Sequence, residues 1–251
     1  GIKVFAPLVY IINLFFHRSI HYVGVGGWLP RMLEENSILK RIVKSFDGIY
    51  VELLSMAYQL KENGLIQSRY LPNVRNYSDN IIQRKRENVC IYSRIIETKG
   101  INDAIEIVKI FNNHTGSTIK LDIYGMIGPE FESEFNNLLR TNSNFVHYKG
   151  VKGPNEGVET VSNYKVLLFP TYYDGEGFAG TILDAFGSGT PVIANDWKYN
   201  KEIIESGVDG FIYSYRDVKE AADLLENLYN NDSKYNKMSE AAKLKSISFL
   251  P

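Results

Sequence analysis

The chain has 251 residues, with 28 Lys and Arg against 29 Asp and Glu, which gives a formal net charge of −1. Hydrophobic residues make up 44% and charged residues 23%, as in globular proteins, and the length suits one large domain or two small ones. The balanced charge excludes a strongly basic nucleic-acid module, so no nucleic-acid partner is expected. The single cysteine, Cys90, excludes a disulfide framework and a cysteine-based zinc site.

The longest apolar run, residues 4–16, contains a proline and an asparagine. A bilayer-spanning helix needs about 20 apolar residues, so this run is too short to cross a membrane. It also lacks the basic flank and the small-residue cleavage site of a signal peptide. We expect a cytoplasmic protein, and the opening residues, Gly-Ile-Lys rather than Met, indicate a fragment truncated at its N-terminus.

Short apolar runs alternate with amphipathic patterns along the rest of the chain. Strands are expected at residues 21–25, 89–93, 119–124, 145–149, 166–170, 191–194 and 210–213. The run Val166-Leu167-Leu168-Phe169 is continuously apolar, which is typical of a parallel strand covered on both faces. Apolar side chains recur at helical spacing between the strands, for example at Ala104, Val108 and Phe111. This alternation predicts an α/β fold with a doubly wound parallel sheet.

A break in the pattern divides the chain. Residues 76–88 are polar, rich in turn-forming residues and without periodicity, so they are predicted to form a linker. Six expected strands follow this linker, enough for a complete Rossmann-like sheet in residues 89–251. Only one convincing strand precedes it, and one strand cannot form a sheet. Residues 1–75 are therefore predicted to be the C-terminal remnant of a second domain.

The most informative stretch starts at Asp174 and leads from the buried strand into a helix, which is expected to begin near residues 179–181 and to end at residues 187–189. Its three glycines leave backbone N–H groups accessible at the helix N-terminus, where the helix dipole favours a phosphate or diphosphate. Glu176 and Asp184 lie eight residues apart beside this anion site. Because carboxylates repel an anion, we expect them to bind vicinal hydroxyls of a sugar or ribose.

This stretch resembles the signature of the family-4 retaining glycosyltransferases, the glycosyl transferases group 1, of the bacterial polysaccharide-biosynthesis type. In that signature two glutamates separated by seven residues flank the nucleotide-sugar site of a GT-B fold. Glu176 and Asp184 stand at the two positions here, and Asp184 is one methylene shorter than the family's glutamate. The resemblance implies a GT-B-like chain, with residues 89–251 as the donor-binding domain and residues 1–75 as part of the acceptor-side domain.

Further motifs follow in the family's order. Ser93-Arg94 and Lys99-Gly100 resemble the segments whose Arg and Lys grip the donor diphosphate. Gly125 stands where the family has a glycine after its second strand. Residues 148–151, which end in Val151, resemble the segment that meets the base. Together these matches extend the resemblance over roughly residues 70–230.

The resemblance implies transfer of a sugar from a nucleoside diphosphate sugar, which we expect to be a UDP-sugar, to a hydroxyl of a glycan or lipid-linked acceptor, with retention. Arg94 and Lys99 would stabilise the leaving diphosphate and Glu176 would orient the sugar, so these three are the expected catalytic residues. Donor contacts are expected from Ser93, Gly125, Val151, Gly177, Phe178, Ala179, Gly180, Thr181 and Asp184, the last through the ribose. The sequence has no Asp-x-Asp motif, so neither a metal nor another cofactor is expected.

Two other functions remain open on the sequence. One is a non-catalytic nucleotide-sugar binding module, since the first half of the acceptor domain is absent and this chain alone is expected to transfer sugar poorly. The other is an NAD(P)-binding oxidoreductase domain. Gly175-x-Gly177-x-x-Gly180 is a literal dinucleotide fingerprint, and Asp196 lies 21 residues beyond Gly175.

The first region also has features of a contact surface. The apolar run at residues 4–16 and the basic residues Lys40, Arg41 and Lys44 would suit peripheral contact with the inner face of a membrane. Exposed apolar residues there would also favour self-association. His17 and His21 have the spacing of a helical metal pair, but His21 belongs to an expected strand, so no metal site is predicted.

Overall fold

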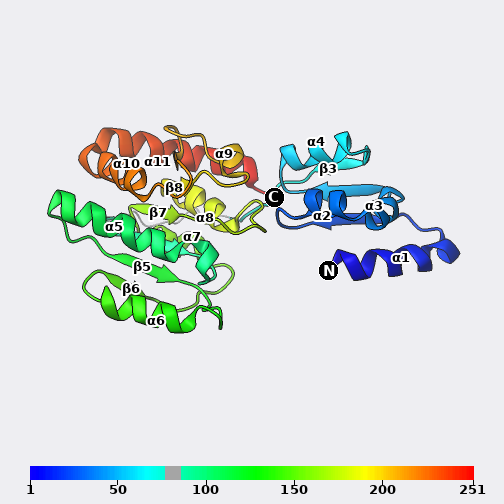
Figure 1. Cartoon of the computed structure of the whole chain (residues 1–251). Coiled ribbons are helices and arrows are strands. Elements are labelled where there is room, and N and C mark those ends of the chain that lie inside the picture. The colour runs from blue at the N-terminus through cyan, green and yellow to red at the C-terminus, as the bar shows by residue number, and fades with distance from the viewer. Residues whose placement is uncertain (77–85) are drawn as a thin grey trace. The chain divides into compact units, whose positions relative to one another are not determined.

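The computed structural model describes residues 1–76 and 86–251, in two compact units (Figure 1). The first unit consists of residues 1–73 with 174–178, and the second of residues 74–173 with 179–251. Most of the predicted linker, residues 77–85, lies outside the described residues.

The first unit contains a three-stranded parallel sheet in the order β1-β2-β3. Its elements are α1 (Ile2–Phe16), β1 (His21–Gly24), α2 (Leu29–Glu35), α3 (Ser37–Lys44), β2 (Gly48–Val51), α4 (Leu54–Glu62) and β3 (Ser68–Tyr70). The prediction of a single strand in this region is therefore wrong. In β3, two of the three residues are exposed, so this strand has no apolar pattern, whereas the short apolar run Ile49–Val51 of β2 was overlooked.

The second unit contains a six-stranded parallel sheet in the order β6-β5-β4-β7-β8-β9. Its strands are β4 (Val89–Tyr92), β5 (Leu121–Tyr124), β6 (Val146–Tyr148), β7 (Val166–Phe169), β8 (Val192–Asn195) and β9 (Gly210–Tyr213). All six expected strands are confirmed within one or two residues at their ends. The strand order reverses between β4 and β7, which is the point where doubly wound sheets bind their ligands.

Helices cover both faces of this sheet. They are the 3-10 helix η1 (Glu97–Lys99), α5 (Ile101–Thr115), α6 (Glu132–Thr141), α7 (Gly157–Val161), α8 (Gly180–Ser188), α9 (Asn200–Ile203), α10 (Val218–Asn230), α11 (Asp232–Ser246) and the 3-10 helix η2 (Ile247–Phe249). α5 packs beside α10, and α8 packs against both α7 and α11 (Figure 1). Because helices shield both faces, every residue of β7 is buried, and so is Cys90 in β4.

Local contacts fix the C-terminal end of α8, the helix that the sequence placed at the candidate site. Gly189 ends the helix in the left-handed region with φ of 63°, as glycine readily does. The Arg86 guanidinium donates to the last carbonyl oxygens, at 2.8 Å to Ser188 and 3.0 Å to Gly189. The predicted limits of this helix are confirmed. Among the described residues, no helix combines the length and the apolar character needed to span a membrane.

Candidate functional site

The loops that follow β4, β5 and β6 are fastened to one another at the carboxyl edge of the second unit's sheet. The Ser93 N–H donates to the Tyr124 carbonyl at 3.1 Å, and the Gly125 N–H donates to the Gly150 carbonyl at 3.0 Å. Gly125 has φ of 140°, and a Cβ at this position would collide with the Ser93 carbonyl oxygen. The glycine is therefore required for the two loops to approach each other.

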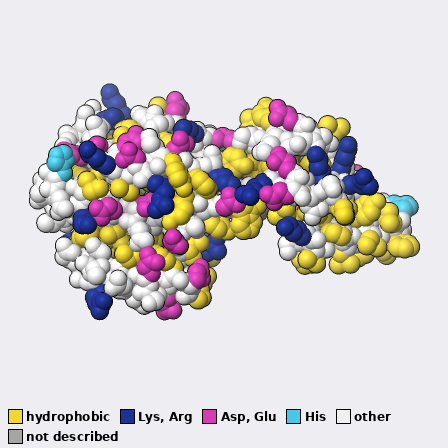
Figure 2. Space-filling view, viewed as in Figure 1, with side chains coloured by type: hydrophobic (Ala, Val, Ile, Leu, Met, Phe, Trp, Pro, Cys, Tyr) yellow, Lys and Arg dark blue, Asp and Glu magenta, His cyan; other side chains and the backbone are white. Residues whose placement is uncertain are grey.

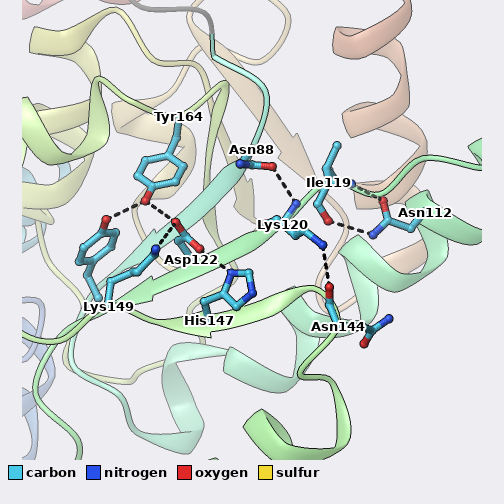
Figure 3. A network of polar contacts seen from close by, with 10 residues as sticks. Asn88, Asn112, Ile119, Lys120, Asp122, Asn144, His147, Lys149 and Tyr164 are labelled. Carbon is cyan, nitrogen blue, oxygen red and sulfur yellow. Dashed lines mark hydrogen bonds and ion pairs between the residues drawn. The ribbon is translucent and has the colours of Figure 1, made fainter.

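A polar network underlies the loop after β6 (Figure 3). The Asp122 carboxylate accepts a 2.7 Å hydrogen bond from the Tyr164 hydroxyl and lies 3.5 Å from the Lys149 ammonium and 3.2 Å from His147 Nδ1. Burial, followed by the hydrogen bonds of its hydroxyl, raises the pKa of Tyr164, which stays a neutral donor. The network holds Lys149 directly before Gly150 and Val151, and Val151 is 64% exposed.

Arg94 and Lys99 gather at one aromatic ring. The Arg94 guanidinium carbon lies 5.2 Å from the centroid of the Tyr173 ring, and the Lys99 ammonium lies 5.0 Å from the same centroid. Both distances are within cation–π range. Lys99 is only 9% exposed, in η1. The next residue, Gly100, has φ of 73°, and a Cβ there would collide with the Pro170 carbonyl. The sequence placed both cations here but did not predict Tyr173 as their common contact.

The N-terminus of α8 lies against the end of β4. Ala179 is the N-cap residue and Gly180 begins the helix. The Thr181 hydroxyl donates to the Tyr92 carbonyl at 2.8 Å, so this side chain ties the helix to the strand. No side chain of the described residues caps this end of the helix. The arrangement keeps the positive end of the α8 dipole at the sheet edge, where it favours an anion.

Asp184 on α8 is paired with Arg75, a residue that sequence reasoning did not single out. Arg75 Nε lies 3.2 Å from Asp184 Oδ1, and Asp184 is 7% exposed. Burial raises the pKa of the Asp184 carboxyl, and the Arg75 charge and hydrogen bond act in the opposite direction. Arg75 precedes Asp184 by 109 residues, so spacing along the sequence carries no signal of the pair.

Glu176, Gly177 and Phe178 belong to the first unit. The Gly27 N–H donates to the Gly175 carbonyl at 3.1 Å, and Asn73 Nδ2 donates to the Phe178 carbonyl at 3.2 Å. Gly177 packs so closely on Gly26 that a Cβ would lie 2.8 Å from the Gly26 Cα. Within this segment Glu176 is 8% exposed.

A second carboxylate, Glu52, accompanies Glu176. Glu52 follows β2 and accepts a 2.8 Å hydrogen bond from the Gly26 N–H and another from the Phe178 N–H. Its pKa is raised, mainly by burial and in a smaller part by the negative charge of Glu176. The Phe178 N–H, which the sequence assigned to the donor, thus binds Glu52 in this structure. Glu52 itself escaped prediction because no motif surrounds it.

The described residues contain no cluster of side chains that could bind a metal ion. Neither residues 1–76 nor residues 86–251 bring together three or more His, Cys, Asp or Glu side chains that could hold a metal ion. His17 is the C-cap residue that follows α1 and His21 begins β1, so the two do not share a helix.

Comparison with known proteins identifies the family of this chain. Residues 75–245 match the protein family described as Glycosyl transferases group 1. The chain belongs to this family. The match to these glycosyl transferases starts close to the beginning of the second unit and contains Arg94, Lys99, Glu176 and Asp184. Family membership removes the support for an NAD(P)-binding oxidoreductase, since the glycine fingerprint is part of the glycosyl transferase segment.

Two curated relatives match parts of the chain. The capsular polysaccharide biosynthesis glycosyltransferase CapM of Staphylococcus aureus is 28% identical over 205 residues, which are 80% of this chain and 48% of CapM. The GtfA subunit of the UDP-N-acetylglucosamine–peptide N-acetylglucosaminyltransferase of Streptococcus pneumoniae is 31% identical over 144 residues, which are 56% of this chain and 27% of GtfA. The chain thus spans half or less of the length of these two relatives.

Solved structures share the fold. Anabaena HepE in complex with UDP has a TM-score of 0.83 at 14% identity, covering 100% of this chain and 73% of HepE. S. aureus TarM, in a complex that contains UDP, has a TM-score of 0.73 at 20% identity, covering 86% of this chain and 44% of TarM. These similarities confirm the α/β, GT-B-like fold class.

Proposed function

We propose that this chain binds the donor of a glycosyltransferase that moves a sugar from a UDP-sugar to a hydroxyl of a glycan or lipid-linked acceptor, with retention. The observation that carries the proposal is the convergence of Arg94 and Lys99 on Tyr173, at the end of the sheet where the strand order reverses. A diphosphate is the natural ligand of two such cations beside a helix N-terminus. UDP is named in the HepE and TarM complexes, which supports the choice of nucleotide.

The proposed chemistry follows from where charge develops. The bond between the sugar's anomeric carbon and the diphosphate oxygen breaks, the acceptor oxygen bonds to that carbon, and the acceptor's proton leaves with the diphosphate. Negative charge grows on the leaving group, where Arg94 and Lys99 would stabilise it. Glu176 would orient the sugar and Asp184 the ribose. Ser93, Gly125, Val151 and the backbone from Gly177 to Thr181 would complete the donor contacts.

UDP is expected to raise the melting temperature of the chain without added metal. A ligand that binds only the folded state stabilises it, by about 2.7 kcal/mol at a hundredfold excess over Kd. Differential scanning fluorimetry with UDP, in buffer containing EDTA, measures the shift, and NAD serves as the comparison ligand. A shift that EDTA abolishes would contradict the metal-free account. Donor binding without hydrolysis or transfer of its sugar would favour the non-catalytic binding module.

We further propose that α1 and α3 contact an anionic membrane at its cytoplasmic face. Large apolar side chains of α1 are exposed, among them Phe15 at 80%. Figure 2 shows hydrophobic side chains gathered over the surface that α1 occupies in Figure 1. α1 packs against α3, and the two helices carry four Lys and Arg residues and no acidic residue. Apolar side chains beside basic ones are typical of helices that lie in a membrane interface.

The membrane contact predicts charge-dependent vesicle binding. Lys40→Gln with Lys44→Gln should weaken binding to phosphatidylcholine–phosphatidylglycerol vesicles, since each basic residue near such a surface contributes about 1 kcal/mol, or roughly fivefold in affinity. Co-sedimentation measures the loss, and pure phosphatidylcholine vesicles are the control. Light scattering tests the alternative of self-association. If Phe5→Ser turns an oligomer into a monomer and no variant binds vesicles, the membrane proposal is wrong.

A further inference from the structure

The Arg75–Asp184 ion pair is held on several sides within the second unit. The Arg75 N–H donates to the Phe249 carbonyl at 3.0 Å, which fixes the backbone that carries the guanidinium. A Cβ at Gly180 would collide with the guanidinium, and a Cβ at Gly157 would collide with the Asp184 carboxylate. Glycine at these two positions therefore leaves room for the pair.

The ion pair with Arg75 favours the charged form of the buried Asp184 carboxyl. A buried carboxylate prefers its neutral form, and a nearby cation restores the charged form. Both influences act on Asp184, with burial raising its pKa and Arg75 opposing that rise. The ionised carboxylate accepts charge-assisted hydrogen bonds on both oxygens, whereas protonation removes the charge and turns one oxygen into a donor, which weakens acceptance from a vicinal diol.

Two other titratable groups of the described residues lie on elements next to the pair. Tyr92, at the end of β4, feels the negative charges of Asp184 and Glu156, and its pKa is raised mainly by burial. Lys245, on the neighbouring α11, is engaged by Asp209 at 2.5 Å. Within the described residues, the charge that lowers the pKa of the Asp184 carboxyl is that of Arg75.

We propose that Arg75 is a positioning residue for the donor ribose: it keeps Asp184 ionised and holds Oδ1, so that the carboxylate can accept the ribose hydroxyls. The inference rests on the proposed function, since it assumes that the second unit binds UDP. It also accounts for the shorter acidic side chain. Asp184 reaches less far than a glutamate would. Because Arg75 holds the shorter carboxylate in one orientation, that carboxylate can still face the ribose hydroxyls.

The experiment compares UDP with 2′-deoxy-UDP by isothermal titration calorimetry. The wild-type chain should prefer UDP roughly 10- to 150-fold, the range for a hydrogen bond to a charged group. Arg75→Gln should bring this preference close to one, and Arg75→Lys should retain part of it. UDP affinity should also fall more steeply in Arg75→Gln than in the wild type as the pH is lowered, because without the guanidinium the Asp184 pKa rises and the carboxyl protonates at a higher pH.

Lys245→Gln is the matched control. It removes the cation from another buried aspartate, Asp209, whose pKa is likewise raised by burial and opposed by its partner. This variant should leave both the nucleotide preference and its pH profile unchanged. A general loss of stability would change the preference for UDP over 2′-deoxy-UDP in both variants. A positioning role of Arg75 would change this preference only in Arg75→Gln.

A second pair of variants removes the buried negative charge of Asp184. These variants test the role of Arg75 even if Arg75→Gln does not fold. Asp184→Asn and the double variant Arg75→Gln/Asp184→Asn should show the same low preference for UDP. A wild-type preference in Asp184→Asn, or a further loss in the double variant, would overturn the inference. Absence of UDP binding in the wild-type chain would instead refute the proposed function.

Discussion

Replacing Lys99 with alanine is expected to weaken UDP binding roughly 10- to 150-fold, the effect of losing a charge-assisted hydrogen bond of about 1.5–3 kcal/mol. Lys99 is almost buried in η1, with its ammonium 5.0 Å from the Tyr173 ring centroid. Its position costs little further ordering when the diphosphate binds, because the side chain is already confined. Isothermal titration calorimetry with UDP and with uridine separates the phosphate contribution from that of the base and ribose.

Lys165→Ala provides the matched control. Lys165 is also a largely buried lysine of the second unit whose ammonium lies over an aromatic ring, 4.7 Å from the Tyr229 centroid. Removing it should change stability and leave UDP affinity unaltered. Equal UDP affinity in Lys99→Ala and the wild type, with uridine binding also unchanged, would remove Lys99 from the donor site.

The complete sheet of the second unit could be predicted because burial on both faces leaves a plain pattern in the sequence. Val166–Phe169 is apolar throughout and every residue of it is buried. In the first unit, β2 has only the short apolar run Ile49–Val51, and β3 lacks the signal. In β3, only Ser68 is buried, and the strand forms because its backbone pairs with Ile49–Val51 of β2. Pairing between distant segments decides such strands, and local composition does not reveal it.

The candidate site was predictable where a residue's place in a motif fixes its place in the fold. Arg94 and Lys99 follow the first strand of the sheet, so topology alone puts them at its carboxyl edge. Their common contact with Tyr173 depends on the path of the loop that follows β7. The pairing of Arg75 with Asp184 and the hydrogen bonds of Glu52 are likewise long-range contacts. Such contacts require the tertiary structure.

Glu176→Gln is expected to separate sugar recognition from nucleotide binding. The substitution keeps the shape of a side chain that is 8% exposed, removes its negative charge and replaces one acceptor oxygen with an NH2 donor. UDP affinity should stay within about twofold, because Glu176 is proposed to contact the sugar and not the phosphates. Affinity for the true UDP-sugar should fall roughly 10- to 150-fold, as should turnover where transfer is measured.

The measurement is a titration of wild type and variant with UDP, UDP-glucose and UDP-N-acetylglucosamine, the two sugars being trial donors. Glu226→Gln is the control, since Glu226 pairs with His114 at 2.8 Å and has no proposed contact with the donor. Glu176→Gln also removes the repulsion that Glu176 exerts on Glu52, so the Glu52 pKa should fall toward its ordinary value. That shift occurs whether or not the sugar touches Glu176, and it provides an internal check that the substitution acts where the structure places it. A UDP-sugar that binds and turns over equally in both proteins, while the Glu52 pKa moves, would show that Glu176 stands beside Glu52 for a reason other than sugar recognition.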